Sequence, residues 1–93
     1  MFPSDHRLTL DASRAIWREI GDEIVVLDSA TATYLSLNFS AVTLWKRLDS
    51  GATPAELADE LVSAYDISPA QAENDVEGFL VALRDLSLLS SNG

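Results

Sequence analysis

The stretch EIVVLDSATATYLSLNFSAVTLWKRL, residues 23–48, contains the change of pattern that decides the fold. Up to Asn38, β-branched and aromatic residues come in short runs separated by turn formers, and beyond it apolar residues recur at helical spacing. Residues 24–27 are all apolar, so both faces of a strand built from them would be hydrophobic. Such a run is typical of a central strand that is covered on both sides.

Two further strands are predicted to flank this central one. Residues 15–20 form the first, joined to it through a turn at 21–22, and a turn at 28–31 leads to the last strand at 33–37. Residues 8–10 extend or precede the first strand. Because successive strand residues point to opposite faces, the last strand presents Leu35 and Leu37 on one face and Tyr34 and Ser36 on the other.

Three helices are predicted after Asn38. The first has an apolar stripe at i, i+3, i+4 and i+7, formed by Ala41, Leu44, Trp45 and Leu48. Residues 53–56 and 68–71 are typical of helix starts, because a hydroxyl that can cap the helix precedes a proline at the first helical position. The third helix spans about residues 69–86. Three short strands cannot bury a face alone. The sequence therefore predicts an α+β fold, a three-stranded antiparallel sheet followed by three helices.

Size and charge restrict the classes of partner. The chain has 93 residues, enough for one modest domain, and its six basic and fifteen acidic residues give a net charge of −9. Nucleic acids and anionic membranes are bound through basic surfaces, so we expect neither as a partner. The chain has no cysteine, which excludes disulfides and thiolate sites and is compatible with the cytoplasm, the location we expect.

No pattern in the chain predicts catalysis. His6 is the only histidine, and no GxSxG, phosphate-binding glycine loop, HExxH or EF-hand pattern occurs. The carboxylates of Glu56, Asp59 and Glu60 share a helix face, an arrangement typical of a solvated surface. We therefore expect no catalytic residue, no metal site and no cofactor.

The third helix carries an unusual stripe beside its core face, made of Asp75, Gly78, Ala82 and Asp85 at i, i+3, i+7 and i+10. Glycine inside a helix costs roughly 1 kcal/mol relative to alanine, and small residues let another backbone approach closely. Either the chain's own sheet or another helix packs there, or a partner segment lies along the helix. The last strand offers a matching edge, to which an extended peptide can pair. From periodicity alone, Leu35 and Phe79 fit the core better than a contact surface.

The order of these features resembles that of the PqqD-like family. Residues 25–45 are similar to its pattern of hydrophobic-Leu-Asp, turn, Tyr-x-x-Leu-Asn and helix. Residues 48–89 have its glycine after the first helix, a second helix ending in tyrosine, and Asp-Val followed by Leu-x-x-Leu in the third. The resemblance covers residues 15–89. Residues 39–41, Phe-Ser-Ala, depart from the proline or threonine and glycine that are frequent there.

This resemblance implies a winged-helix-like fold and a role in making ribosomally synthesised, post-translationally modified peptides. The precursor's leader peptide would add as a fourth antiparallel strand to the last strand and lie against the third helix. The peptide-binding residues that it implies are Leu27, Ala32, Thr33, Tyr34, Leu35, Ser36, Asp75, Val76, Phe79, Ala82 and Leu83. The recognition domain would be residues 15–89, after an N-terminal arm at 1–14 and before a flexible tail at 90–93.

The stand-alone leader-binding proteins of lasso-peptide clusters are the most similar members. There the precursor passes to a leader peptidase, a transglutaminase-like cysteine protease, and then to a cyclase. The near alternative is PqqD itself, which presents a precursor to a radical enzyme. Two further alternatives are a DNA-binding winged helix and a dimerisation domain that uses the open strand edge. Against DNA, the exposed positions of the third helix hold Glu73, Asp75, Glu77 and Asp85 with only Arg84 positive.

Overall fold

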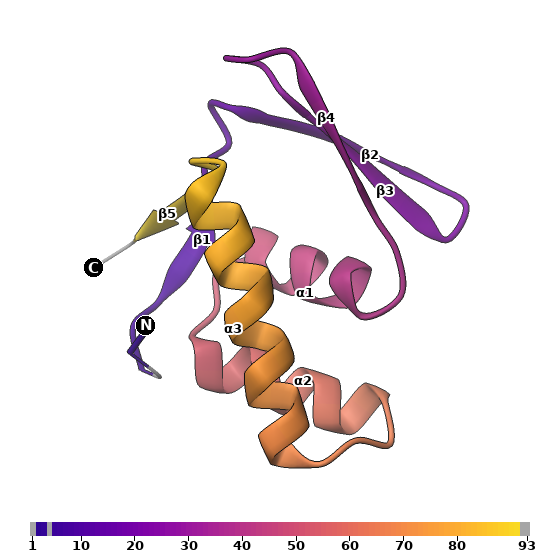
Figure 1. The fold of residues 1–93 in the computed structure, drawn as a ribbon, viewed down its shortest axis with the longest axis vertical. Helices are drawn as coiled ribbons and strands as arrows, with labels where there is room; N and C mark the ends of the chain where they lie inside the picture. Colours follow the sequence, from indigo (N-terminus) through magenta and orange to yellow (C-terminus); the bar gives the residue numbers. More distant parts are fainter. Residues whose placement is uncertain (1, 4, 92–93) are drawn as a thin grey trace.

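The computed structural model describes residues 2–3 and 5–91, in which four strands precede three helices and a short strand follows them (Figure 1). Strands β2, β3 and β4 form an antiparallel sheet with β3 in the middle. The predicted α+β fold and its central strand are confirmed. The elements are β1 (Leu8–Leu10), β2 (Ala15–Ile20), β3 (Glu23–Asp28), β4 (Thr33–Leu37), α1 (Ser40–Asp49), α2 (Pro54–Ala64), α3 (Pro69–Asp85) and β5 (Leu89–Ser91).

Two turns fix the register of the sheet. The β2–β3 turn has Gly21 at a φ of 61°, a conformation that glycine adopts at little cost. In the second turn, Ala32 has a φ of 57° and its N–H donates to the carbonyl oxygen of Asp28 over 2.8 Å. Ala32 therefore closes the turn, and β4 begins at Thr33.

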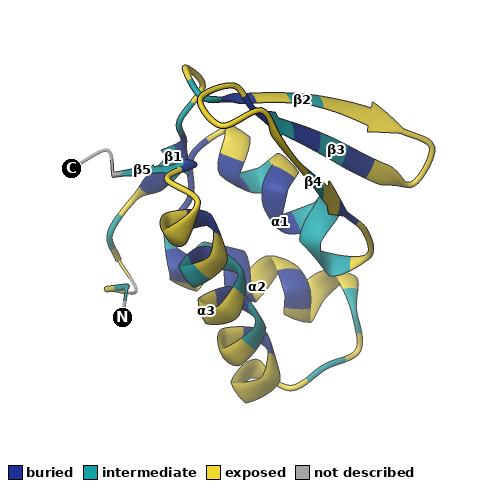
Figure 2. Cartoon of the chain, turned by 45° about the horizontal axis from the view of Figure 1, so that its top comes forward, coloured by how far each residue is buried: buried dark blue, intermediate teal, exposed yellow. Residues whose placement is uncertain are grey.

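The helices cover only one face of the sheet (Figure 2), so the expectation that β3 is covered on both sides is wrong. Ile24 and Val26 point toward the helices and are fully buried, whereas Val25 and Leu27 lie on the other face and are half-buried. The apolar run still suits a central strand, because its neighbours β2 and β4 shield the outer side chains from both sides.

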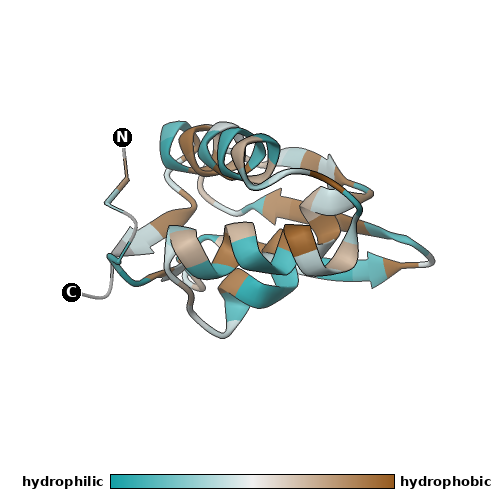
Figure 3. Ribbon diagram, turned by 90° about the horizontal axis from the view of Figure 1, so that it is seen from below, coloured by the Kyte–Doolittle hydropathy of each residue, from teal (hydrophilic) through white to brown (hydrophobic). Residues whose placement is uncertain are grey.

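Trp45 of α1 is the largest fully buried side chain and joins the helices to the sheet. Its ring meets Trp17 of β2 edge-on, with 6.1 Å between ring centroids. The start signals of α2 and α3 are confirmed: the hydroxyls of Thr53 and Ser68 accept backbone N–H bonds. Each helix carries alternating apolar and polar segments (Figure 3), as expected when one side is packed. No helix in the described part of the chain is long and apolar enough to cross a bilayer.

The two ends of the described chain pair with each other. β1 lies antiparallel to β5, with Leu8 opposite Ser91 and Leu10 opposite Leu89. Leu8 and Leu10 are buried in the same core as the helices, so this part of the expected N-terminal arm packs on the domain. Of the expected tail, residues 90–91 pair with β1 through their main chain. Residues 92–93 lie outside the described residues.

Asp28, at the end of β3, is the buried charged residue of the described chain, with 6% exposure. Its carboxylate lies 3.1 Å from the Arg14 guanidinium and accepts the Ala30 N–H over 3.0 Å. Burial alone would raise the pKa of Asp28, but these hydrogen bonds and the charge of Arg14 outweigh it. The pKa of Asp28 therefore lies below its ordinary value of 3.8.

Replacing this carboxylate should make stability depend less on pH. A carboxyl whose pKa is depressed by folding stabilises the fold above its unfolded-state pKa. That contribution is lost as the pH falls below 3.8 through the folded-state value. We expect Asp28→Asn to have a lower urea midpoint than the parent near neutral pH, with a gap that closes in acid. Asp22→Asn, in the exposed β2–β3 turn, is the control. A gap that stays constant down to about pH 2 would contradict this.

Candidate functional site

The sheet ends on two edge strands, β2 and β4, that differ in chemistry. β2 has Arg18 and Glu19 within it, and charged side chains discourage further strand pairing at an edge. β4, with the sequence TYLSL, has no charged residue, and it pairs with β3 on one side only. The edge of β4 is therefore the one suited to accept another strand.

A groove of about 440 Å³ lies between α1 and α3. α1 follows β4 after only two residues, 38–39 (Figure 1), so Ser40, the first α1 residue that lines the groove, is three positions after the end of that strand. We call it the α1–α3 groove. Its lining residues are Ser40, Ala41 and Leu44 from α1 and Asn74, Asp75, Gly78 and Phe79 from α3.

The surroundings of Gly78 show whether the chain itself packs on the small-residue stripe of α3 or leaves it open to a partner. A Cβ built on Gly78 would meet nothing within 4 Å outside its own helix, so no other part of the described chain packs on it. One turn earlier, the Asp75 carboxylate accepts a hydrogen bond from the Gln71 side-chain amide over 2.9 Å, which helps to orient it. The stripe thus faces open space and leaves α3 accessible to a partner.

Some of the predicted site residues come together on this side of the molecule. Asp75 and Phe79 line the α1–α3 groove, and Ala82, exposed, follows Phe79 by three positions on α3. On β4, Thr33 is exposed, and Leu35 lies half-buried on the face that points toward the helices. Phe79 and Leu35 both pack against the core while keeping part of their surface exposed.

Val76 and Leu83 are placed in the core, with 2% and 1% exposure, so their prediction as contact residues is corrected. Successive helix positions differ by about 100° in direction, and a shift of one position from Asp75 turns Val76 toward α2. Helical spacing shows that a residue shares a stripe, but it does not show which neighbour packs on that stripe.

Four of the predicted strand-side residues do not line the α1–α3 groove, although Tyr34 and Ser36 lie in β4 as expected. Leu27, Tyr34 and Ser36 belong to the outer face of the sheet, opposite the helices, because the strand alternation separates them from Leu35. Leu27 is therefore no floor of the α1–α3 groove. Ala32 lies in the turn before β4.

The groove residues Ser40, Ala41, Leu44 and Asn74 were not predicted from the sequence. Ala41 and Leu44 had been assigned to the core stripe of the first helix, and they do pack there as well. Phe39 was also missed: it is 81% exposed, directly precedes Ser40 and has a φ of 54°. A side chain other than glycine is strained in that conformation. The only feature of the sequence that pointed to Phe39 was the departure of residues 39–41 from the family pattern.

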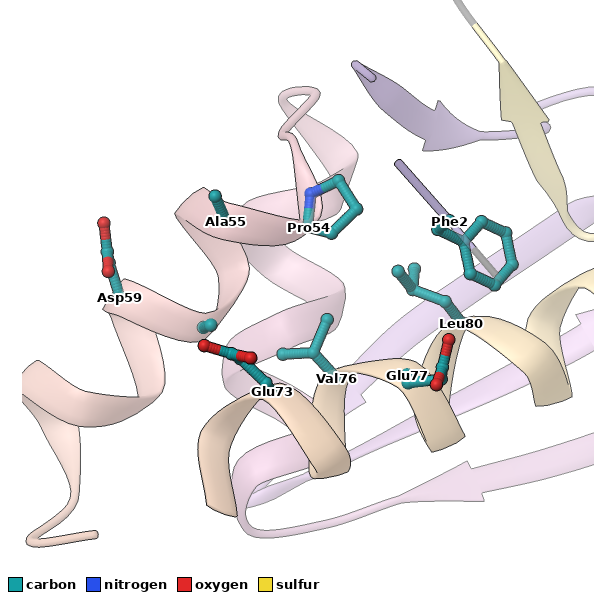
Figure 4. Close-up of a pocket in the computed structure, with 9 residues that line it drawn as sticks. Phe2, Pro54, Ala55, Asp59, Glu73, Val76, Glu77 and Leu80 are labelled. Carbon is teal, nitrogen blue, oxygen red and sulfur yellow. The ribbon is translucent and has the colours of Figure 1, made fainter. Parts of the chain in front are cut away.

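A second hollow, of about 430 Å³, lies between α2 and α3 on another side of α3. Figure 4 shows Pro54 and Asp59 on one helix facing Glu73, Val76 and Leu80 on the other, with Phe2 at one end. No residue of α1 lines this hollow, whereas the lining of the α1–α3 groove includes Ser40, which follows β4 after two residues. In the part of the chain that the structure describes, no three His, Cys, Asp or Glu side chains cluster as metal ligands would.

Comparisons with known proteins agree on the family. The family model described as coenzyme PQQ synthesis protein D (PqqD) matches residues 23–89. The structure of TbiB1 in complex with the TbiA(beta) leader peptide is similar, with 29% identity, a TM-score of 0.82 and coverage of 88% of this chain and 94% of that one. A lasso peptide synthetase B1 complexed with the leader peptide has 25% identity, a TM-score of 0.79 and coverage of 89% and 96%. No curated protein matches the chain.

The open surroundings of Gly78 lead to a stability prediction. Gly78→Ala should raise the free energy of unfolding by about 0.5–1 kcal/mol, because alanine is the better helix former and its methyl group meets no neighbour. Urea denaturation measures this. Gly51→Ala is the matched control and should destabilise, because Gly51 has a φ of 89° and its added Cβ would lie 3.2 Å from Arg7. A loss of stability in Gly78→Ala would mean that another segment packs on the stripe.

Proposed function

The chain belongs to the PqqD family, and we propose that it is a non-catalytic protein that binds the leader peptide of a ribosomally made precursor. The observation that carries the proposal is an uncharged, unpaired strand edge at β4 that leads within two residues into α1, one wall of the open α1–α3 groove. The leader-peptide complexes of the two similar structures support it.

In this mechanism the leader pairs with β4 as a fourth antiparallel strand. Main-chain hydrogen bonds to the edge supply affinity that depends little on sequence. Alternate leader side chains point toward the helices, where an apolar one enters the α1–α3 groove and packs on Phe79. The exposed methyl of Ala82 and the open position at Gly78 let the peptide approach α3 closely. One or two such anchors carry most of the binding energy in peptide recognition.

The charge of the protein bears on how fast the leader binds. A net charge of −9 attracts a leader that has some basic residues, and exposed Glu73, Glu77 and Asp85 put part of that charge on α3. Asp75, half-buried in the groove, can pair with a basic or hydrogen-bonding group of the leader. Association should therefore slow as salt screens the attraction.

The bound precursor is then presented to a separate maturation enzyme, in the cytoplasm. We infer that this enzyme is the leader peptidase of a lasso-peptide pathway, a transglutaminase-like cysteine protease, and that a cyclase acts next. The lasso peptide synthetase B1 among the similar structures favours this assignment. The description of the family model favours the other candidate, presentation to a radical enzyme as in coenzyme PQQ synthesis.

Phe79→Ala should weaken binding of the leader peptide by about tenfold or more, because it removes the aromatic wall of the groove. Fluorescence anisotropy of the labelled leader of the precursor encoded with this chain measures it. Ile67→Ala is the matched control: Ile67 is also half-buried against the core, but it lies in the α2–α3 connection and does not line the groove. Both variants should melt earlier, and only Phe79→Ala should lose affinity. Absence of saturable binding by the parent protein would reject the proposed function.

Phe39→Gly should stabilise the protein and yet weaken leader binding. Glycine relieves the φ of 54°, worth about 1 kcal/mol, while the exposed aromatic ring of the residue that precedes Ser40 is lost. Ser87→Gly relieves a φ of 59° at the far end of α3 and should stabilise without changing affinity. If both variants bind the leader like the parent, Phe39 makes no contact in the complex.

A further inference from the structure

The hollow between α2 and α3 has an apolar floor. Ala58, Val76 and Leu80, all buried, form this floor, and the half-buried ring of Phe2 closes one end (Figure 4). We call it the α2–α3 hollow. Its volume of about 430 Å³ lies within the range of roughly 300–1,000 Å³ that is typical of ligand pockets. The hollow is therefore large enough to receive a long side chain from another molecule.

Three carboxylates surround this floor. Asp59 belongs to the α2 wall, and Glu73 and Glu77 belong to the α3 wall (Figure 4). All three are exposed, and within the described part of the chain none of them has an ion pair or a hydrogen bond. Glu73 and Glu77 stand at i and i+4 on one helix, a spacing at which like charges repel. The hollow thus concentrates negative charge that lowers the stability of the fold.

The basic side chains of the chain are engaged elsewhere. Five of the six form ion pairs, and no carboxylate of the hollow takes part in them: Arg7 and Arg47 with Glu56, Arg14 with Asp28, Lys46 with Glu19, and Arg84 with Asp85. The sixth, Arg18, lies on β2, which does not line the hollow. Neutralisation of the rim by a basic side chain therefore requires a second molecule.

We propose that the α2–α3 hollow receives an arginine side chain, which a partner protein presents on the apolar face of a helix. The stem of the arginine packs on the apolar floor, and its guanidinium reaches the carboxylates of both walls. The inference goes beyond leader binding, because the hollow lies on another side of α3 from the α1–α3 groove.

The arrangement of the rim favours arginine over lysine. A guanidinium is a planar fork with five N–H donors, so it can bond Asp59 on one wall and Glu73 on the other at once, whereas an ammonium is a point charge. Phe2 adds to this preference, since the face of an aromatic ring attracts cations. The guanidinium of Arg84 already lies 5.6 Å from the centre of the Phe2 ring, which shows that this ring accepts one.

The walls of the hollow also determine the form of the partner segment. Both walls are helices and offer no strand edge, so an incoming segment must satisfy its own backbone hydrogen bonds. An amphipathic helix does so and is the usual occupant of a groove between helices. Ala55, exposed at the hollow, has a small side chain that lets such a helix come close to α2.

A second copy of this chain is a less suitable partner. Among the described residues, Arg18 is the cation that a copy could offer without breaking an ion pair of its own, and Arg18 lies on a strand. Two copies would also bring a net charge of −9 each to the contact, and that repulsion opposes association.

The test uses the full chain and a capped, alanine-based helical peptide with arginine at position i and leucine at i+4, so that both lie on one face. The control peptide has citrulline, the neutral isostere of arginine, in its place. In ¹H–¹⁵N correlation spectra of the labelled chain, the arginine peptide should cause saturable shifts at residues 55–59 and 73–80. It should bind at least about tenfold more tightly than the citrulline peptide.

A double variant removes charge from the hollow and keeps the shape of its side chains. Glu73→Gln with Glu77→Gln should weaken binding of the arginine peptide by about tenfold. The melting temperature should stay the same or rise, because the repulsion between the two carboxylates is gone. Glu60→Gln with Asp66→Asn is the matched control: it removes the same charge from exposed positions outside the hollow and should bind the peptide like the parent.

Each other result counts against the proposal. Absence of saturable shifts, equal affinity for the two peptides, or unchanged affinity in the Glu73→Gln, Glu77→Gln variant overturns it. Shifts spread over the acidic surface, or confined to residues 33–37 of β4, also overturn it because they place the arginine elsewhere. A parent that sediments as a dimer and becomes a monomer in that variant assigns the hollow to a second copy instead. No leader peptide is present in any arm, so failure to bind the leader rejects the proposed function alone.

Discussion

The structure depends on one constraint: the three-stranded sheet is satisfied only in part by the rest of the chain. β3 is paired on both sides and the helices cover one face, so β4 has a free edge and apolar side chains on the outer face stay exposed. The N–H and C=O groups of an edge strand need hydrogen-bond partners. Water serves as that partner until another strand pairs with the edge. β2 carries charges that discourage such a partner, and β4 does not. The distribution of charge between the two edges thus directs pairing to the strand that lies beside the groove.

Much of the fold was predictable because its signals are local. Gly21 marks a turn that needs a positive φ, and Thr53 with Pro54 marks a helix start, so a few neighbouring residues define each boundary. Pairing of β1 with β5 was not predicted, because it joins residues that are about eighty positions apart and leaves no periodic trace. The sequence also did not predict that helices cover only one face of β3. An apolar residue on a central strand can be shielded by the neighbouring strands as well as by helices, and the sequence pattern is the same in both cases.

The site was predictable in part. The stripe through Gly78 indicated that something approaches α3, but only the empty space around its Cα showed that the approaching backbone is not the chain's own. Val76 and Leu83 share the apolar character of contact residues, but both are buried in the core, and their spacing does not encode that packing. Tyr34 and Leu35 were both predicted to bind the peptide, although strand alternation puts their side chains on opposite faces of the sheet. Phe39 is strained and exposed, a combination that sequence patterns do not reveal.

The central claim is that a leader peptide becomes the fourth strand at β4. Hydrogen–deuterium exchange of the protein with and without saturating leader peptide tests it most directly, because strand addition slows exchange of the amides that it pairs. The account predicts that protection rises at residues 33–37 of β4 and along the groove face of α3, and stays unchanged at residues 15–20 of β2. Saturable binding that protects β2, or that leaves β4 as exposed to exchange as before, would contradict it.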